Sequence, residues 1–267
     1  MSGNLRAALT LLPSRRGSEL PSEPLRQDGV RVDRERLAAY ARVCGFRLSD
    51  DLPVTYPHVL AFPLTMRLIT TPGMPFPAVG LVHIANRITR LRPLTAASPL
   101  DLEVRAERLR PHGRGRQFDV VTTATVDGVR VWHGVATYLS KEPTAGERAE
   151  KGDPAPAPAP SAVWRVPARV GTDYAAVSGD RNPIHTSRVG ARLFGFPRPI
   201  AHGMWSKARC LAALEGRLPS AFTVDVTFRA PILLPGTVSF AAARAADGWE
   251  FGLSGKRPHL AGQVTPP

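Results

Sequence analysis

The apolar positions along the chain change from helical to strand-like spacing, and the same succession occurs twice. In the first half, residues 32–43 place their apolar side chains on one face, which predicts a short helix. Residues 60–68 predict a longer helix that Pro63 interrupts early. A period of two then predicts strands, and Asp127-Gly128 is a strong signal for a hairpin. The strands expected in this half span residues 100–107, 118–126 and 129–139.

The second half follows the same order. Residues 163–166 begin it as a strand, residues 172–177 predict a helical turn, and residues 204–218 predict the main helix. Residues 223–228 then alternate apolar and polar side chains, as a half-buried strand does. Further strands are expected at residues 238–243, 249–253 and 259–264, separated by Asp247-Gly248 and Ser254-Gly255.

The two halves also share sequence. The hexapeptide YARVCG at Tyr40 matches YAAVSG at Tyr174 with an offset of 134 residues, and a proline-containing stretch before a strand recurs with an offset of 138. We infer a duplicated unit whose first copy has lost its polar site residues. The offsets place Phe46 opposite Asp180, Asp51 opposite His185, and Leu64 and Thr65 opposite His202 and Gly203.

A Pro-Ala alternation separates the halves, and it can form neither a helix nor a sheet ladder. We therefore expect an α+β protein of two packed units, with one site instead of two. The expected parts are an N-terminal extension (1–24), a degenerate first unit (25–140), a linker (141–161) and a second unit that carries the site (162–267).

Composition narrows the function classes. The net charge is +13, but 31 of the 35 basic residues are arginines spread along the chain without interleaved aromatics, so we expect no nucleic-acid role. Such a surface suits polyanionic ligands such as coenzyme A phosphates or an acidic carrier protein. No apolar run is long enough to span a bilayer and no cleavable leader is evident, so we expect a cytoplasmic protein without a membrane span. Two cysteines without metal-like spacing indicate no disulfide framework.

Residues 178–204 combine groups suited to proton transfer. Asp180 and His185 are five residues apart around Asn182-Pro183, and we expect a bend there, not a helix, because proline disfavours the helical region for the residue before it. Gly203 begins the main helix, where free backbone N–H groups and the helix dipole stabilise a developing oxyanion. An acid/base pair beside such amides suits proton transfer next to a carbonyl.

Plainer interpretations stay open for each residue alone. Asp180 could be a turn or N-cap aspartate, and a lone His185 is more often structural. Asn182 could order the turn around Asp180 or form only an Asx-turn, and His202 could pack or hydrogen-bond behind the oxyanion site without direct chemistry. Asp180, His185 and His202 are suitable metal ligands, but no carboxylate cluster or His-x-His spacing supports a metal site. The sequence contains no G-x-S-x-G motif, which argues against a serine hydrolase.

The run from Tyr174 to Met204 closely resembles the signature of MaoC-like (R)-specific enoyl-CoA hydratases, the hydratase branch of the hot-dog fold. The whole chain resembles the two-repeat actinobacterial (3R)-hydroxyacyl-thioester dehydratases. This resemblance implies a double hot-dog fold, in which two helix-wrapped sheets form an intrachain pseudo-dimer. It also implies reversible syn addition of water to a trans-2-enoyl thioester, with coenzyme A or carrier-protein phosphopantetheine as part of the substrate and no separate cofactor.

By the same resemblance, Asp180 and His185 activate water and move protons, and the Gly203 amide binds the thioester oxygen. Asn182 and His202 support them. The degenerate half then forms the acyl tunnel, with Tyr56, Phe62 and Met66 as candidate lining residues, although plain core packing would explain all three. The helix departs from the family pattern because only Ser206 offers a small polar side chain near its start, so the size of the acyl pocket stays open.

Two rival functions are a non-catalytic acyl-thioester binding or scaffold subunit and a hot-dog thioesterase. The retained Asp/His pair argues against the scaffold. A monomer already holds both units, and homodimers occur in similar folds, so the oligomeric state stays open.

Overall fold

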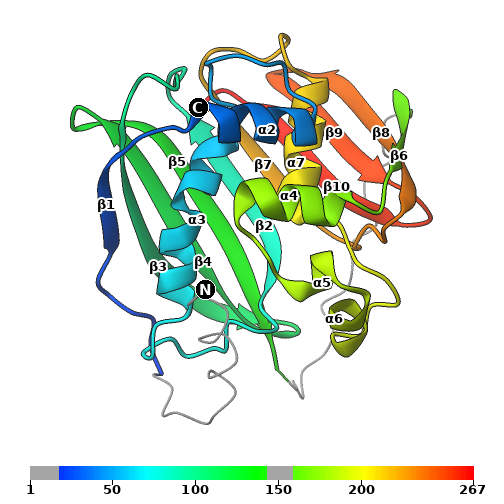
Figure 1. Ribbon diagram of the computed structural model, residues 1–267, viewed down its shortest axis with the longest axis horizontal. Helices are drawn as coiled ribbons and strands as arrows, with labels where there is room; N and C mark the ends of the chain where they lie inside the picture. The colour runs from blue at the N-terminus through cyan, green and yellow to red at the C-terminus, as the bar shows by residue number, and fades with distance from the viewer. Residues whose placement is uncertain (1–17, 143–158) are drawn as a thin grey trace.

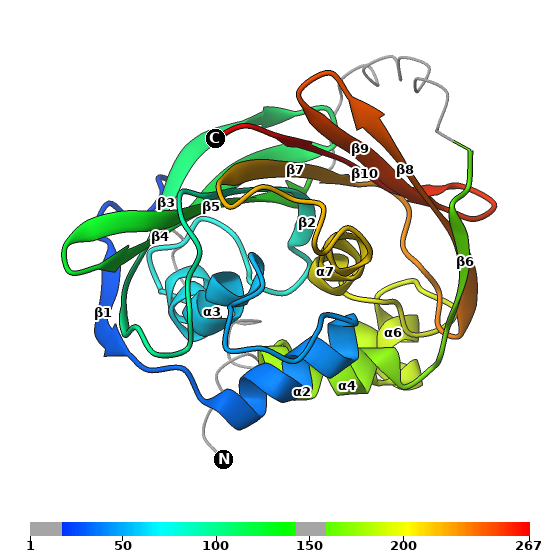
Figure 2. The same cartoon turned by 90° about the horizontal axis from the view of Figure 1, so that it is seen from above.

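The computed structural model describes residues 18–142 and 159–267, and in them a single sheet of ten strands curves around two central helices (Figure 1). Seen from above, α3 and α7 lie in the concave side of the sheet, and α2 and α4 form a layer outside them (Figure 2). The elements of the first half are β1 (Leu25–Val30), α2 (Arg34–Cys44), α3 (Tyr56–Ile69), β2 (Val82–Arg90), β3 (Leu100–His112), β4 (Gly115–Val126) and β5 (Val129–Lys141).

The second half has the same elements with two additional short helices before α7. They are β6 (Ala162–Val166), α4 (Val170–Ser178), α5 (Pro183–Thr186), α6 (Arg188–Leu193), α7 (Gly203–Ala213), β7 (Phe222–Phe228), β8 (Gly236–Ala245), β9 (Gly248–Ser254) and β10 (Pro258–Thr265). The strand order is β1-β3-β4-β5-β2 in the first half and, from the opposite edge, β6-β8-β9-β10-β7 in the second. Both halves therefore follow one topology, as the repeat in the sequence predicts.

The halves join where β2 pairs antiparallel with β7. On the outer face of this seam, Arg87 forms an ion pair with Asp225 at 2.7 Å. On the inner face, the fully buried Lys207 of α7 donates hydrogen bonds to the backbone and side-chain oxygens of Asn86 at 2.9 and 2.6 Å and to the carbonyl of Val224 at 3.1 Å. Burial lowers the pKa of Lys207, but three acceptors match the three N–H groups of an ammonium. Lys207 thus ties the helix that begins at the site to both halves of the sheet.

The core lies between the sheet and the helices and is rich in aromatic side chains that are almost completely buried. Trp132 of β5 donates a hydrogen bond to the carbonyl of Val54 at 2.7 Å, just before α3. Tyr40 of α2 contacts Tyr174 of α4 with a ring separation of 6.0 Å, so the same tyrosine of each repeat meets its copy across the pseudo-dimer.

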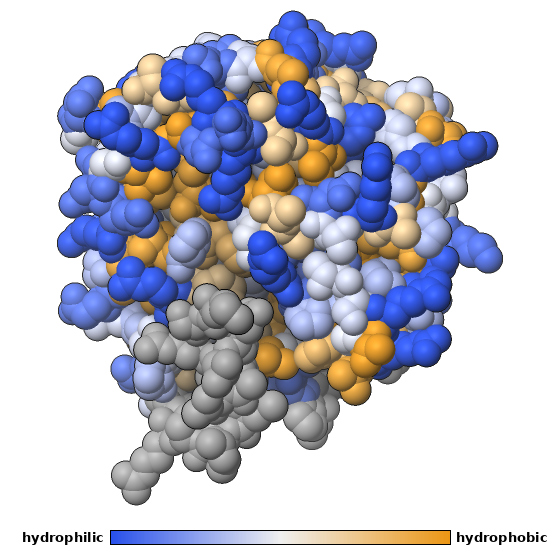
Figure 3. All heavy atoms as spheres, in the orientation of Figure 1, coloured by the Kyte–Doolittle hydropathy of each residue, from blue (hydrophilic) through white to orange (hydrophobic). Residues whose placement is uncertain are grey.

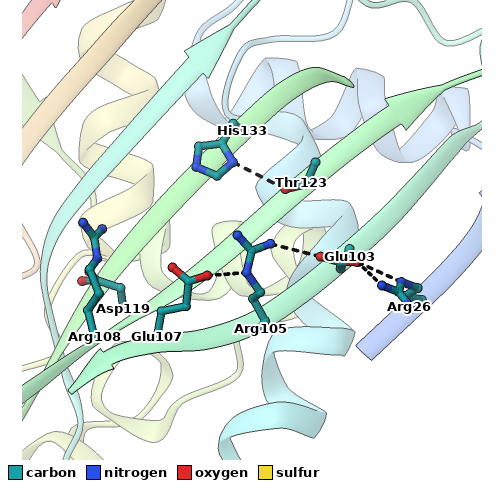
Figure 4. Close-up of polar contacts among 8 residues, drawn as sticks. All are labelled: Arg26, Glu103, Arg105, Glu107, Arg108, Asp119, Thr123 and His133. Carbon is teal, nitrogen blue, oxygen red and sulfur yellow. Dashed lines mark hydrogen bonds and ion pairs between the residues drawn. The ribbon is translucent and has the colours of Figure 1, made fainter. Parts of the chain in front are cut away.

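Many of the arginines lie on the outer face of the sheet in ion pairs (Figure 4). Arg105 of β3 donates to Glu103 at 3.0 Å and to Glu107, and Glu103 also binds Arg26 of β1 at 2.7 Å. These pairs are partly exposed, so each contributes little to stability. The glutamates nevertheless neutralise part of the arginine charge, so arginines can lie side by side on the outer face of the sheet.

The helix boundaries depart from the sequence prediction in three places. The expected helix at 32–43 is α2, which begins after the N-cap Asp33. The expected helix at 60–68 starts four residues earlier, at Tyr56, and continues through the exposed Pro63 because its other face is buried. The main helix was expected to reach residue 218 but ends at Ala213, where i+3 hydrogen bonds and the left-handed Gly216 turn the chain away.

The hairpins follow the sequence prediction closely. Asp127 and Gly128 both adopt left-handed backbone angles (φ 52° and 75°) between β4 and β5, as a tight two-residue turn requires. The offset of 138 residues was wrong around the site: α3 begins at Tyr56 and α7 at Gly203, so Leu64 and Thr65 lie two turns inside α3 instead of opposite His202 and Gly203. The inserted helices α5 and α6 account for this difference. The linker expected at 141–161 falls mostly outside the described residues, as do residues 1–17 of the N-terminal extension.

Candidate active site

The segment between α4 and α7 is built from short capped turns. Gly179 ends α4 in the left-handed conformation (φ 84°). The Asp180 carboxylate then accepts a hydrogen bond from the backbone N–H of Asn182 at 3.2 Å. The side chain of Asn182 in turn accepts one from the N–H of Ile184 at 3.2 Å and caps α5. Asp180 and Asn182 therefore both hold the turn, as the plainer interpretations expected, and the second carboxylate oxygen of Asp180 stays available for other partners.

The expectation of a non-helical bend at His185 was wrong, because His185 lies within the four-residue helix α5. Asn182 itself is extended (ψ 125°), as a residue before proline should be. Pro183 then occupies the first turn of the helix, where its missing N–H would have had no partner anyway. The proline thus starts the helical turn instead of preventing it.

His185 is held in one orientation. Its side chain is 9% exposed, and its Nδ1 lies 2.8 Å from the carbonyl oxygen of Ile200, so the N–H is on Nδ1 and donates to that oxygen. Nε2 is then left with a lone pair. Burial lowers the pKa of His185, although the Asp180 charge and the Ile200 carbonyl oppose the shift. The imidazole is therefore a neutral proton acceptor at physiological pH.

His202 fixes the other side of the turn. Its Nε2 donates to the backbone carbonyl of Asp180 at 3.0 Å and lies 3.8 Å from the carboxylate. Its ring stacks on that of His185 with a centroid separation of 3.7 Å and an interplanar angle of 27°. Burial and the neighbouring His185 both lower the pKa of His202. The prediction that His202 packs behind the site thus agrees with a ring that locks His185 and the Asp180 backbone together.

Gly203 is the first residue of α7, so its N–H has no carbonyl partner within the helix. A Cβ at this position would lie 3.1 to 3.3 Å from three atoms of the Phe228 ring. Glycine therefore leaves room for the close approach of Phe228, a side chain of the seam strand β7, and the sequence alone did not reveal this contact. The backbone N–H lies at the positive end of the helix dipole.

Asp180, His185 and His202 converge, since one polar atom from each lies within 4.8 Å of the others. The Asp180 side chain is 32% exposed while both imidazoles are buried, so the group opens to solvent at the carboxylate. An aspartate and two histidines could ligate a metal ion. Here, however, the two rings lie face to face, whereas ligands of one ion direct their in-plane lone pairs to a common point. The arrangement suits an acid/base pair better.

Helix α3 of the first half lies against the end of α4, next to the site. Its His58, Phe62 and Met66 are spaced four residues apart and share one helix face. The Phe62 ring lies 3.7 Å from where a Cβ on Gly179 would be, next to Asp180. Burial lowers the pKa of His58 to about 4, with Lys207 adding to the shift and the Asp180 charge opposing it. No other described residue forms a hydrogen bond with the His58 imidazole. The charge of Asp180 therefore acts on a buried ring that belongs to the other half of the chain.

Tyr56, the third candidate lining residue, lies in the core and contacts Tyr40 edge-on with a ring separation of 5.1 Å. Its buried hydroxyl has no hydrogen-bond partner in the described part of the chain. His58 and Tyr138 were not predicted as site residues, although the Asp180 charge raises the pKa of each. The signal for His58 was its four-residue spacing to Phe62, which was hidden because the helix was predicted to start at residue 60. Tyr138, on β5, had no local signal.

Fold and site together define a double hot-dog protein with one Asp/His centre. A model of the MaoC-like domain matches residues 166–250. The chain is 41% identical to 3-hydroxyacyl-thioester dehydratase X of Mycobacterium tuberculosis over 272 residues, which cover 97% of this chain and 95% of that protein. It is 29% identical to the enoyl-CoA hydratase ChsH3 of the same organism, over 66% of this chain and 65% of that one.

A crystal structure of HtdX from Mycobacterium tuberculosis matches with a TM-score of 0.82 at 39% identity and covers 92% of this chain and 100% of that chain. The chain therefore belongs to the MaoC-like dehydratase family. A MaoC-like dehydratase from Phytophthora capsici shares the fold at 19% identity, with a TM-score of 0.74 over 96% of this chain and 98% of that one. The resemblance and the double hot-dog fold expected from the sequence are confirmed.

Proposed function

We propose that this protein is a hydro-lyase that reversibly hydrates trans-2-enoyl thioesters to (3R)-3-hydroxyacyl thioesters in fatty-acid metabolism. The single observation that carries the proposal is the convergence of Asp180 and His185 next to the free start of α7. The names of the relatives support it, since they are a 3-hydroxyacyl-thioester dehydratase and an enoyl-CoA hydratase.

The spacing of the pair fits one bridging water. Two hydrogen bonds of about 2.8 Å that share a water molecule span about 4.5 Å, and the polar atoms of Asp180 and His185 lie within 4.8 Å. Both groups accept hydrogen bonds, so they hold both O–H groups of the water and direct its lone pair outward. One acceptor takes a proton as the water oxygen bonds to the β carbon, and the same proton is then delivered to the α carbon on the same face. We leave open which acceptor moves the proton, because the two are coupled.

The Gly203 amide has the matching electrostatic task. As water adds, negative charge grows on the thioester oxygen, and a helix-start N–H aligned with the helix dipole stabilises that charge. Lys207 lies one turn further along α7, and its hydrogen bonds to Asn86 and Val224 hold the start of this helix against the seam of the sheet. No step requires a metal or a redox cofactor, and coenzyme A or phosphopantetheine enters as part of the substrate.

We further propose that the first half forms the acyl wall through Phe62 and Met66, with Tyr56 behind them.

No helix in the described residues is both long and apolar enough to cross a membrane. Buried, unpaired Cys44 and Cys210 fit the reducing cytoplasm, where we place the protein.

Purified protein incubated with a crotonyl thioester should abolish the absorbance of the conjugated enoyl group and yield the (3R) product. Asp180→Asn and His185→Ala should each lower kcat by about 10²-fold or more, because a positioned acid or base contributes that much. Matched controls are Asp247→Asn in an exposed turn and His259→Ala, whose ring also bonds a backbone carbonyl (Ala230, 3.0 Å). Both controls should keep full activity.

The same assay separates the rival functions. A thioesterase would release free thiol without loss of the double bond, and a thiol reagent detects it. A scaffold subunit would bind the thioester without turnover. Either result, or near-normal rates in both site variants, rules out the proposed mechanism.

A further inference from the structure

The surface around α6 carries an unusual concentration of exposed apolar side chains. Val189, Leu193 and Phe194 are 70%, 80% and 42% exposed, and they account for three of the eight large apolar side chains that are exposed in the described residues. They lie within six consecutive positions. In Figure 3 apolar atoms gather at the lower right, where α6 lies in Figure 1, with hydrophilic atoms beside them. Clustered apolar exposure indicates an interaction surface.

This surface is rigid. The hydroxyl of Ser187 caps α6 by accepting a hydrogen bond from the N–H of Gly190 at 3.2 Å. At the other end, Gly195 adopts the left-handed conformation (φ 80°) and ends the helix. Its N–H donates to the carbonyl of Arg192, and the next N–H, of Phe196, donates to that of Ala191. Gly190 lies directly against Pro183 of α5. The apolar side chains are therefore presented on a fixed element and are not those of a fraying turn.

The surface is strongly basic. Residues 181–202 contain four arginines (Arg181, Arg188, Arg192 and Arg198) and no aspartate or glutamate. None of these four guanidinium groups forms an ion pair with another described residue, although arginines elsewhere in the protein do so repeatedly. Unpaired arginines beside exposed apolar side chains have the composition of a protein–protein interface. A second copy of the chain would be repelled in a symmetric contact, because arginines would face arginines.

The surface is also continuous with the site. The exposed Arg181 directly follows Asp180, whose carboxylate forms the open side of the site. α5, which carries His185, packs against α6. A partner seated on α6 therefore lies beside the exposed carboxylate of Asp180.

We propose that Val189, Leu193, Phe194, Arg181, Arg188 and Arg192, together called the α6 surface, dock an acidic carrier protein that delivers the acyl thioester on its phosphopantetheine arm. The inference rests on the proposed function and names the carrier to which the acyl group of the substrate is bound; this carrier is called the handle below. The apolar side chains distinguish a protein partner from coenzyme A, because phosphates alone would use only the arginines.

The experiment compares three handles for one crotonyl group: a purified acyl carrier protein, coenzyme A and uncharged pantetheine. The variants are Arg188→Glu/Arg192→Glu and Leu193→Ser. Matched controls on the β4–β5 hairpin are Arg130→Glu and Val129→Ser, which alter an exposed arginine and a 63% exposed valine. Turnover of the pantetheine thioester by the unaltered protein tests the proposed function by itself, so the two proposals can fail separately.

With the carrier-protein substrate, we expect the charge reversal to raise KM by about 10-fold or more at low salt, because paired surface charges steer association. Leu193→Ser should raise it by about 5-fold, and neither variant should change kinetics with pantetheine. The proposal is overturned if the unaltered protein shows no preference for the carrier-protein handle over pantetheine. An equal rise with coenzyme A and no effect of Leu193→Ser would assign the arginines to nucleotide phosphates instead. Light scattering completes the test, since a dimer that Leu193→Ser dissociates would make this surface a contact between copies.

Discussion

The contact between Gly203 and Phe228 allows a sharp test of the oxyanion site. A methyl group at residue 203 would lie 3.1, 3.2 and 3.3 Å from three ring atoms of Phe228. Carbon atoms prefer about 3.5 to 4.0 Å, so either the ring or the first turn of α7 must move by a few tenths of an ångström. Phe228 is itself held edge-on by His83 with a ring separation of 5.0 Å. We therefore expect the helix start, which carries the amide, to move.

Gly203→Ala should thus lower both the free energy of unfolding and kcat, each for a different physical reason. Overpacking costs about 1–3 kcal/mol, and the gain in helix propensity from alanine, up to about 1 kcal/mol, offsets part of it. Complete loss of an oxyanion donor lowers kcat by about 10²–10³-fold, so a displaced donor should lower it by about 10–100-fold. Thermal unfolding measures the first effect, and initial rates of crotonyl-thioester hydration measure the second.

The double variant Gly203→Ala/Phe228→Leu gives the control. Removing the ring opens space for the new methyl group, so the double variant should recover most of the rate that Gly203→Ala loses, and a double-mutant cycle should show strong coupling. A Gly203→Ala protein of normal rate would refute the reasoning, because the amide would then not depend on this contact. A double variant as slow as Gly203→Ala would show that Phe228 is not the cause.

Three further predictions use the buried titratable groups. Because burial lowers the pKa of His185 below its usual 6.5 and the neutral ring is the active form, kcat/KM should stay constant down to pH 6.5 and fall only below it; a midpoint above 6.5 would contradict this. The pKa of His58 is lowered from 6.5 to about 4, so between these pH values the folded state binds fewer protons than the unfolded state. The free energy of unfolding should therefore fall by roughly 3 kcal/mol as the pH drops from 6.5 to about 4. His58→Gln should remove this part of the pH dependence in denaturant titrations, and an unchanged slope would count against it. Lys207→Met leaves buried acceptors unpaired and should lower the free energy of unfolding by about 2–3 kcal/mol, whereas the exposed Lys256→Met should change it by less than about 0.5 kcal/mol.

Local chemistry in the sequence predicted the hairpins and the helix that begins at Gly203, because turn residues and apolar periods act over a few neighbours. It failed where burial outweighed local preference. α3 extends through Pro63 since the helix face opposite that proline is packed, and α5 forms at Pro183 since Asn182 caps it. The repeat was visible, but the offsets of 134 and 138 residues could not place the two inserted helices α5 and α6.

The sequence by itself determined which groups are present: a carboxylate and an imidazole five residues apart and a glycine at a helix start in the second unit, and a first unit that lacks all three. Only the tertiary structure decided what they face. His58 and Phe62 come to the Asp180 loop from the other repeat, Phe228 comes to Gly203 from the seam strand, and Lys207 spans the seam. The physical reason is that periodicity assigns a side chain to a face of its own element, whereas its neighbours depend on strand pairing between residues more than 100 positions apart.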